Sequence, residues 1–139
     1  INDEELAMIS GETEVYKAIP KVLELGPRFV VLKKGAHGAM LVSSDTCFAL
    51  PAFPVKDVID PTGAGDSFGG GFMGWLARTG DLSVENMQRA LVAGTLTASF
   101  TVENFSVDGL LLLTREKLYE RHQEFRKVTI WDALDELKP

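Results

Sequence analysis

With 139 residues, 45% of them apolar, this chain is long and apolar enough to build one domain, or part of one, around a core. Its net charge of −6 argues against a surface for nucleic acid or anionic membranes, which needs clustered Lys and Arg. It contains no apolar run near the ~18 residues of a membrane span. The single cysteine, Cys47, excludes an internal disulfide and favours a reducing, cytoplasmic location, and we expect it to be a small buried residue.

The first half of the sequence predicts one helix followed by three short strands. Apolar residues recur at helical spacing over 13–26, where Pro20 either kinks the helix or starts its second part. The β-branched and aromatic run at 28–34 predicts a strand buried on both faces. The glycines of 35–38 indicate a turn. Two further strands are expected at 39–43 and 47–50, with a tight connection between them.

Helical spacing returns in the second half. A helix is expected over 66–80, with Gly80 as its stop. A second helix covers 83–103, where Gly94 indicates close packing against a neighbour, and a third covers 114–128. Alternation of helices with strands favours the α/β class. The expected inward side chains are Phe68, Phe72, Trp75 and Leu76 in the first helix and Met87, Leu91, Leu96 and Phe100 in the second, and the expected N-caps are Ser83 and Thr114.

The stretch "DPTGAGDSFGGG" at 60–71 is the most informative part of the sequence. The residues before Gly63 are expected to be extended and those after Asp66 helical, so Gly63, Ala64 and Gly65 open a helix. The first amides of a helix lack internal partners, and the aligned peptide dipoles add partial positive charge there. Because the side chains are small, an anion can reach these amides. The stretch therefore predicts a phosphate cradle.

The phosphate cradle does not explain Asp66, because a carboxylate repels a bound phosphate. The acid makes sense as a general base that takes a proton from a hydroxyl attacking that phosphate. The alternative is that Asp66 only caps the helix as an N-terminal acid. Other glycine-loop chemistries fit less well: no Gly-Lys-Ser/Thr tripeptide is present, Phe68 stands where a dinucleotide fingerprint needs glycine, and Glu85 lies at a helix start instead of a strand end.

The sequence "DPTGAGDSFGGGFM" resembles the C-terminal signature of the ribokinase-like (PfkB-type) carbohydrate kinases. Two more stretches support the resemblance. "INDEELAMISG" is similar to the family's Asn-x-x-Glu segment, and "VVLKKGAHGAMLV" is similar to its strand-turn-strand over the nucleotide. The resemblance runs from residue 2 to about residue 126. It implies that 1–139 is the C-terminal portion of a three-layer α/β/α kinase domain.

The resemblance also implies roles for individual residues. Asp66 matches the catalytic base that deprotonates the sugar hydroxyl, and Gly63, Ala64 and Gly65 match the anion hole whose amides stabilise the transferring phosphoryl group. The implied function is therefore ATP-dependent transfer of the γ-phosphoryl group to a sugar hydroxyl. A nucleoside or vitamin-precursor kinase of the same superfamily, and a non-catalytic nucleotide-binding or assembly module, stay open as alternatives.

Further resemblances concern metal and nucleotide. Asn2 and Glu5 match the motif that orients Mg²⁺, although Glu5 could instead be a surface acid. Asp60 and Thr62 match positions that hold a monovalent cation such as K⁺ in several members. Lys33 could be a solvated strand end, and His37 a surface histidine. The implied nucleotide contacts, mostly through backbone, are Lys33, Gly35, His37, Gly38 and Gly65.

The sequence departs from the family pattern in two places and in length. The helix around Val92 and Ala93 lacks the Asn or His that many members place near adenine, and "ENFSVDG" stands where a glycine loop is common. Family members also have an N-terminal half that makes most sugar contacts. We therefore expect this chain, which starts at Ile1, to be part of a longer protein. Alone, it should self-associate as a homo-oligomer or else be poorly stable, and it should not phosphorylate sugars by itself.

Overall fold

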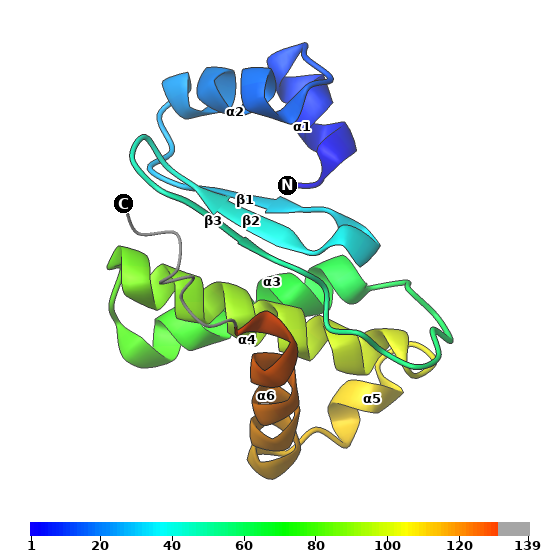
Figure 1. The fold of residues 1–139 in the computed structure, drawn as a ribbon. Coiled ribbons are helices and arrows are strands. Elements are labelled where there is room, and N and C mark those ends of the chain that lie inside the picture. Colours follow the sequence, from blue (N-terminus) through cyan, green and yellow to red (C-terminus); the bar gives the residue numbers. More distant parts are fainter. Residues whose placement is uncertain (131–139) are drawn as a thin grey trace, which may run out of the picture.

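The computed structural model of this protein describes residues 1–130, which form three layers (Figure 1). Helices α1 (Asp3–Ser10) and α2 (Val15–Glu24) cover one face of a small sheet. Helices α3 (Ala64–Thr79) and α4 (Val84–Val102) cover the other face, and α6 (Arg115–Thr129) packs on the far side of α4. A short helix, α5 (Asp108–Leu111), joins α4 to α6. The expected α/β/α layering is confirmed.

The sheet has three antiparallel strands in the order β1-β2-β3. These are β1 (Val30–Lys33), β2 (Ala39–Val42) and β3 (Cys47–Leu50). The expected turn between the first two strands is one 3₁₀ turn, Gly35–His37. On the outer edge of β1, Asn2 forms an isolated parallel bridge with Lys33, and the N–H of Lys33 donates to the carbonyl of Ile1 at 2.8 Å. The start of α1 is thereby tied to the end of β1.

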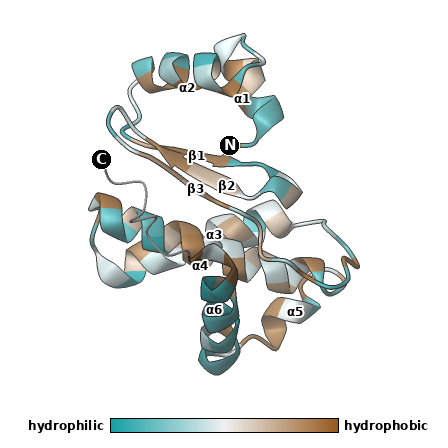
Figure 2. Ribbon diagram, viewed as in Figure 1, coloured by the Kyte–Doolittle hydropathy of each residue, from teal (hydrophilic) through white to brown (hydrophobic). Residues whose placement is uncertain are grey.

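The side chains of β1 alternate between two cores because successive residues of a strand point to opposite faces. Val30 and Leu32 are buried against α1 and α2, whereas Val31 packs toward α3 and α4. Val31 and Lys33 are only half-buried, so the expectation of burial on both faces is correct for one face alone. Hydropathy colouring shows the sheet as an apolar layer between helices with polar outer surfaces (Figure 2).

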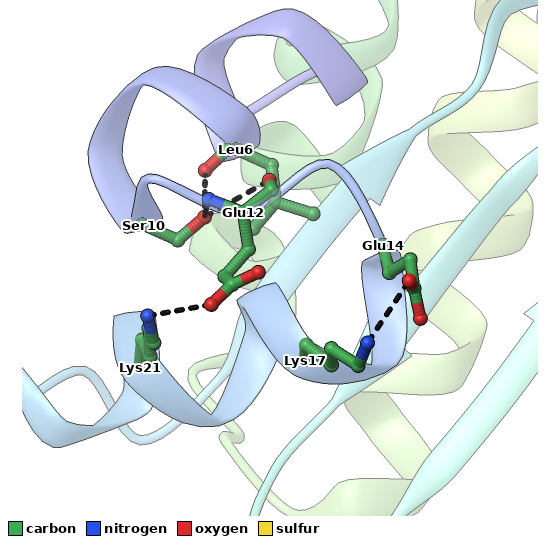
Figure 3. Close-up of polar contacts among 6 residues, drawn as sticks. All are labelled: Leu6, Ser10, Glu12, Glu14, Lys17 and Lys21. Atoms are coloured by element: carbon green, nitrogen blue, oxygen red, sulfur yellow. Dashed lines mark hydrogen bonds and ion pairs between the residues drawn. The ribbon is translucent and has the colours of Figure 1, made fainter.

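Polar contacts fix the connection between α1 and α2 (Figure 3). The hydroxyl of Ser10 donates to the carbonyl of Leu6 at 2.7 Å and accepts from the N–H of Glu12 at 3.1 Å. The carboxylate of Glu12 then pairs with Lys21 at 2.8 Å, one helix away. Pro20 lies inside α2, which is continuous around it.

Among the helices and strands of residues 1–130, α3 and α4 make the most extensive contact. Gly94 permits it, because a Cβ there would lie 2.8 Å from the carbonyl oxygen of Phe68. The expected inward residues of α4 are all buried, and so are Phe68, Phe72 and Leu76 of α3. Trp75 is half-buried and packs against the same core, and its indole N–H donates to the side-chain oxygen of Asn86 at 2.9 Å.

Two caps are confirmed and one burial expectation is wrong. The hydroxyls of Ser83 and Thr114 accept from the third amide of their helices at 3.3 Å. Cys47, expected to be buried, is exposed. It begins the edge strand β3, in which Cys47 and Ala49 point to solvent while Phe48 and Leu50 turn inward. Among residues 1–130, no helix is long and apolar enough to cross a membrane.

Candidate active site at the start of helix α3

The backbone at the start of α3 leaves two amides free. Gly63 is the N-cap with φ +79°, a left-handed conformation that favours glycine, and no side chain caps the helix. The N–H of Ala64 donates to Pro61 at 3.2 Å, and that of Ser67 donates to Gly63 at 2.9 Å. Within residues 1–130 the N–H groups of Gly65 and Asp66 have no acceptor. This geometry suits an anion.

The end of α4 holds both sides of this turn in place. The carbonyl of Val102 accepts from the N–H of Ile59 at 2.7 Å and from that of Asp60 at 3.3 Å. The hydroxyl of Thr101 donates to the hydroxyl of Ser67 at 2.8 Å, and Thr101 is almost fully buried. The loop before Gly63 and the first turn of α3 are therefore fastened to the same rigid helix end.

Asp66 lies in the first turn of α3 and is exposed. Its carboxylate forms no hydrogen bond or ion pair with the described residues, and α3 has no side-chain cap. The structure thus places the carboxylate beside free amides without giving it a capping bond. An acid in this position can accept a proton from a hydroxyl that approaches the same turn.

Lys33 brings a positive charge to the same place. A Cβ built on Gly65 would lie 3.2 Å from the Nζ atom of Lys33. The lysine comes from the end of β1, and its ammonium has no ion-pair partner within 4 Å in the described part of the chain. Lys33 is half-buried, so it is not simply a solvated strand end.

The β1–β2 turn lies beside the loop that leads to α3 (Figure 1). Gly38 has φ +93°, and a Cβ there would collide with the backbone of Leu50 and Pro51. Gly35 also has a positive φ, +52°. The left-handed backbone at both positions therefore explains why each is a glycine. His37 is exposed at the tip of the turn. The nucleotide roles expected for these residues stay predictions.

Asn2 and Glu5 form a capping box at the start of α1. The side-chain oxygen of Asn2 accepts from the N–H of Glu5 at 2.8 Å, and Glu5 accepts from the N–H of Asn2 at 2.7 Å. Glu5 keeps a second carboxylate oxygen, and the bridge to Lys33 puts the pair at the same end of β1. Among the described residues no three His, Cys, Asp or Glu side chains cluster as a metal site. A phosphate-bound Mg²⁺ needs only one or two protein carboxylates, so these oxygens fit it.

Asp60 and Thr62 also come together. The Asp60 carboxylate accepts from the backbone N–H of Thr62 at 2.9 Å, and this bond is the main reason that the pKa of Asp60 lies below its ordinary value. The backbone N–H of Ser106 makes a smaller contribution of the same sign. Ser106 has φ +53°, the single non-glycine residue of 1–130 in the left-handed region. The carboxylate is therefore ionised at neutral pH and suits a hard cation.

Sequence reasoning missed several residues that support the site. Thr101, Ser67 and Ser106 support the turn before α3 only through contacts between segments far apart in the sequence. A hydroxyl directly after Asp66 is a weak local signal, and no local signal exists for Thr101 or Ser106. The ammonium of Lys33 was also not expected to reach Gly65.

A family comparison identifies this arrangement. The model described as "pfkB family carbohydrate kinase" matches residues 1–112, which include the capping box, the β1–β2 turn and the start of α3. The chain belongs to the pfkB carbohydrate kinase family. The ribokinase-like fold expected from the sequence is thereby confirmed.

Individual pfkB-family relatives agree. Cytidine kinase from Thermococcus kodakarensis is 37% identical over 79 residues, which cover 55% of this chain and 28% of that protein. Ribokinase from Thermotoga maritima has a TM-score of 0.74 and 31% identity, over 88% of this chain and 40% of that structure. Aminoimidazole riboside kinase from Salmonella enterica, complexed with aminoimidazole riboside and an ATP analog, has a TM-score of 0.75 and 27% identity. The match covers 87% of this chain and 40% of that structure. The chain spans less than a third of the length of the first curated relatives that it matches.

Proposed function

We propose that the protein containing this chain transfers the γ-phosphoryl group of ATP to a hydroxyl of a sugar or nucleoside, and that 1–139 is the C-terminal portion of its kinase domain. The observation that carries the proposal is the start of α3, where the exposed carboxylate of Asp66 stands beside the free N–H groups of Gly65 and Asp66. An anion hole and a proton acceptor within one helical turn are what this transfer needs.

In the proposed reaction, the acceptor hydroxyl oxygen forms a bond to the γ-phosphorus. The bond from that phosphorus to the bridging oxygen breaks, and ADP leaves with the electron pair. Asp66 takes the hydroxyl proton. The amides that follow Gly63 donate to the oxygens of the transferring group, whose charge is spread in a loose transition state.

Two cations fit the residues at hand. Asn2 and Glu5 would hold Mg²⁺ and its waters, and bound Mg²⁺ supplies neutralisation of phosphate charge. The ionised carboxylate of Asp60 and the backbone of Thr62 would hold a monovalent cation such as K⁺. The turn Gly35–His37, with Gly38, would lie along the nucleotide.

Ribose-containing acceptors have the best support. The relatives named above are a cytidine kinase, a riboside kinase and a ribokinase, and their substrates share a ribose ring. An acceptor panel of ribose, fructose, cytidine and adenosine therefore separates the sugar kinase from the nucleoside kinase.

The test replaces Asp66 by Asn in the full-length protein. Turnover should fall by about 10²- to 10⁴-fold, the usual contribution of a general base, while ATP affinity should stay the same or rise slightly as a like charge near phosphate disappears. Asp57→Asn, an exposed acid in the preceding loop, is the matched control and should leave turnover unchanged. Turnover by Asp66→Asn at the control's level would overturn the proposal.

The non-catalytic alternative predicts a different result. A nucleotide-binding module would bind ATP equally well with and without Asp66, and the wild-type protein would turn over no ATP with any acceptor of the panel. Calorimetry for binding and a coupled ADP assay for turnover together decide between the two functions.

A further inference from the structure

Strand geometry determines where the side chain of Lys33 lies. Lys33 pairs with Ala39, whose side chain belongs to the core shared with α3 and α4. Residues of one strand that are two apart share a face, so Lys33 lies on the α3 face together with Val31. Lys34, one residue later, lies outside β1 at the start of the turn Gly35–His37, where the backbone is no longer extended. Of the two adjacent lysines, strand geometry therefore places Lys33 on the α3 face, and Lys34 belongs to the turn.

The ammonium of Lys33 lies over the anion hole. Its Nζ atom is 3.2 Å from the position that a Cβ of Gly65 would occupy, and Gly65 carries one of the two free amides. No carboxylate among the described residues lies within 4 Å of this ammonium, although Asp66 is the next residue after Gly65. The cation is thus unpaired and half-buried beside a helix start that already favours negative charge.

We propose that the Lys33 ammonium contacts an oxygen of the transferring γ-phosphoryl group and stabilises its charge during transfer. The proposal rests on the proposed function and assigns to the side chain a role that is distinct from the backbone contacts of the β1–β2 turn. Gly65 adjoins Asp66, so the phosphoryl group over Gly65 is the one that the activated hydroxyl attacks. A point charge aimed at that group acts most strongly when its oxygens carry the developing charge.

The absence of a side chain at Gly65 leaves room for the Lys33 ammonium. A methyl group on residue 65 would lie 3.2 Å from the Nζ atom of Lys33, tighter than ordinary contact, so the ammonium would have to shift. An anion bound there would instead receive donors from both β1 and α3. The bound phosphoryl group would therefore contact one element of the sheet and one helix at the same time.

The experiment compares Lys33→Met with Lys34→Met in the full-length protein. Each variant removes one positive charge and keeps a linear side chain. Calorimetry measures the affinities of ADP and of the non-hydrolysable analogue AMP-PNP, and a coupled assay measures kcat. For Lys33→Met we expect kcat to fall about 10²-fold. We expect AMP-PNP affinity to fall about tenfold, as for one hydrogen bond to a charged group, with ADP affinity unchanged. Lys34→Met should resemble the wild type in all three.

Lys33→Arg is the rescue variant, because it keeps the charge, and it should retain the preference of the wild type for AMP-PNP over ADP. The Lys33 proposal is overturned if Lys33→Met keeps wild-type kcat, or if ADP and AMP-PNP lose affinity equally. These outcomes leave the proposed function standing. If the wild-type protein transfers no phosphate to any acceptor, the proposed function fails, and the AMP-PNP preference still decides whether Lys33 contacts the γ-phosphoryl group.

Discussion

At the scale of single residues, the first turn of α3 places opposite charges around free backbone donors. Asp66 contributes a carboxylate and Lys33 an ammonium, and no ion pair within 4 Å joins them. An ion pair between them would neutralise both groups and block the amides. Their separation keeps the acid free to accept a proton and the cation free to meet an anion.

Gly65→Val tests whether this space is used. A β-branched side chain would block the amide and approach Lys33, since even a Cβ would lie 3.2 Å from its Nζ atom. We expect AMP-PNP binding and turnover both to fall, with the fold intact because the position is exposed. Gly70→Val, at an exposed position with open space in the same helix, is the control. Wild-type kinetics in a folded Gly65→Val protein would rule out the phosphate cradle.

At the scale of elements, the α3–α4 pair supports the candidate site because Val102 and Thr101 of α4 hold the turn at the start of α3. The close approach of these two helices depends on glycine at specific positions. Gly94→Ala should destabilise the protein by about 1–3 kcal/mol, since the new Cβ would lie 2.8 Å from the carbonyl oxygen of Phe68. Gly74→Ala, in open space on α3, should instead stabilise it by about 0.5–1 kcal/mol. Urea denaturation measures both changes, and equal effects would contradict the packing argument.

The start of α4 depends on pH through Asp81. Hydrogen bonds from the backbone N–H and the hydroxyl of Ser83, with a smaller effect of Arg89, hold the pKa of Asp81 below its ordinary value. The stabilisation is therefore fully present above the ordinary aspartate pKa, about 3.9, and is lost as the pH falls through the lower pKa of the folded state.

Comparison with Asp81→Asn isolates this effect, because other carboxylates titrate in both proteins. The free energy of unfolding of the wild type should exceed that of the variant at pH 6, and the difference should shrink toward pH 3. If the difference in unfolding free energy grew as the pH falls, the pKa of Asp81 would not be lowered by folding.

At the scale of the whole molecule, Arg121 fastens α6 to the rest of the structure. Its guanidinium pairs with Glu103 at 2.6 Å, donates to the hydroxyl of Ser99 at 2.9 Å, and lies 3.6 Å from the centre of the Phe100 ring and 4.9 Å from that of Phe53. Phe53 belongs to the segment that leads from β3 to the start of α3. One side chain thus joins α4, α6 and that segment.

Arg121→Met should cost about 1–3 kcal/mol, because a mostly buried charge-assisted pair is lost and Glu103 keeps its charge. Lys17→Met is the control: its pair with Glu14 is more than 60% exposed on both sides, and its loss should cost less than about 1 kcal/mol. Thermal and urea unfolding of both variants measure the difference. A cost for Arg121→Met no larger than that for Lys17→Met would contradict the role of Arg121.

The sequence alone determined what depends on local pattern. Helical spacing predicted α2, α3, α4 and α6, and β-branched runs predicted the three strands, because the period of apolar residues reflects which face is buried. The glycines before Asp66 predicted the free amides of α3, since the local backbone creates them. The match to the family model, over residues 1–112, includes this stretch.

Tertiary structure decided what depends on contacts between distant segments. Cys47 is exposed because β3 lies at the edge of the sheet. The local sequence "CFAL" does not indicate whether its strand is central or at an edge. The half-burial of Val31 and Lys33 follows from the layer opposite β1. The position of Lys33 over Gly65 joins residues 32 positions apart, and that of Thr101 at Ser67 joins residues 34 apart. Local propensity sets the conformation of each segment, but only the packing of α3 and α4 on the sheet brings an ammonium, two amides and a carboxylate to one point.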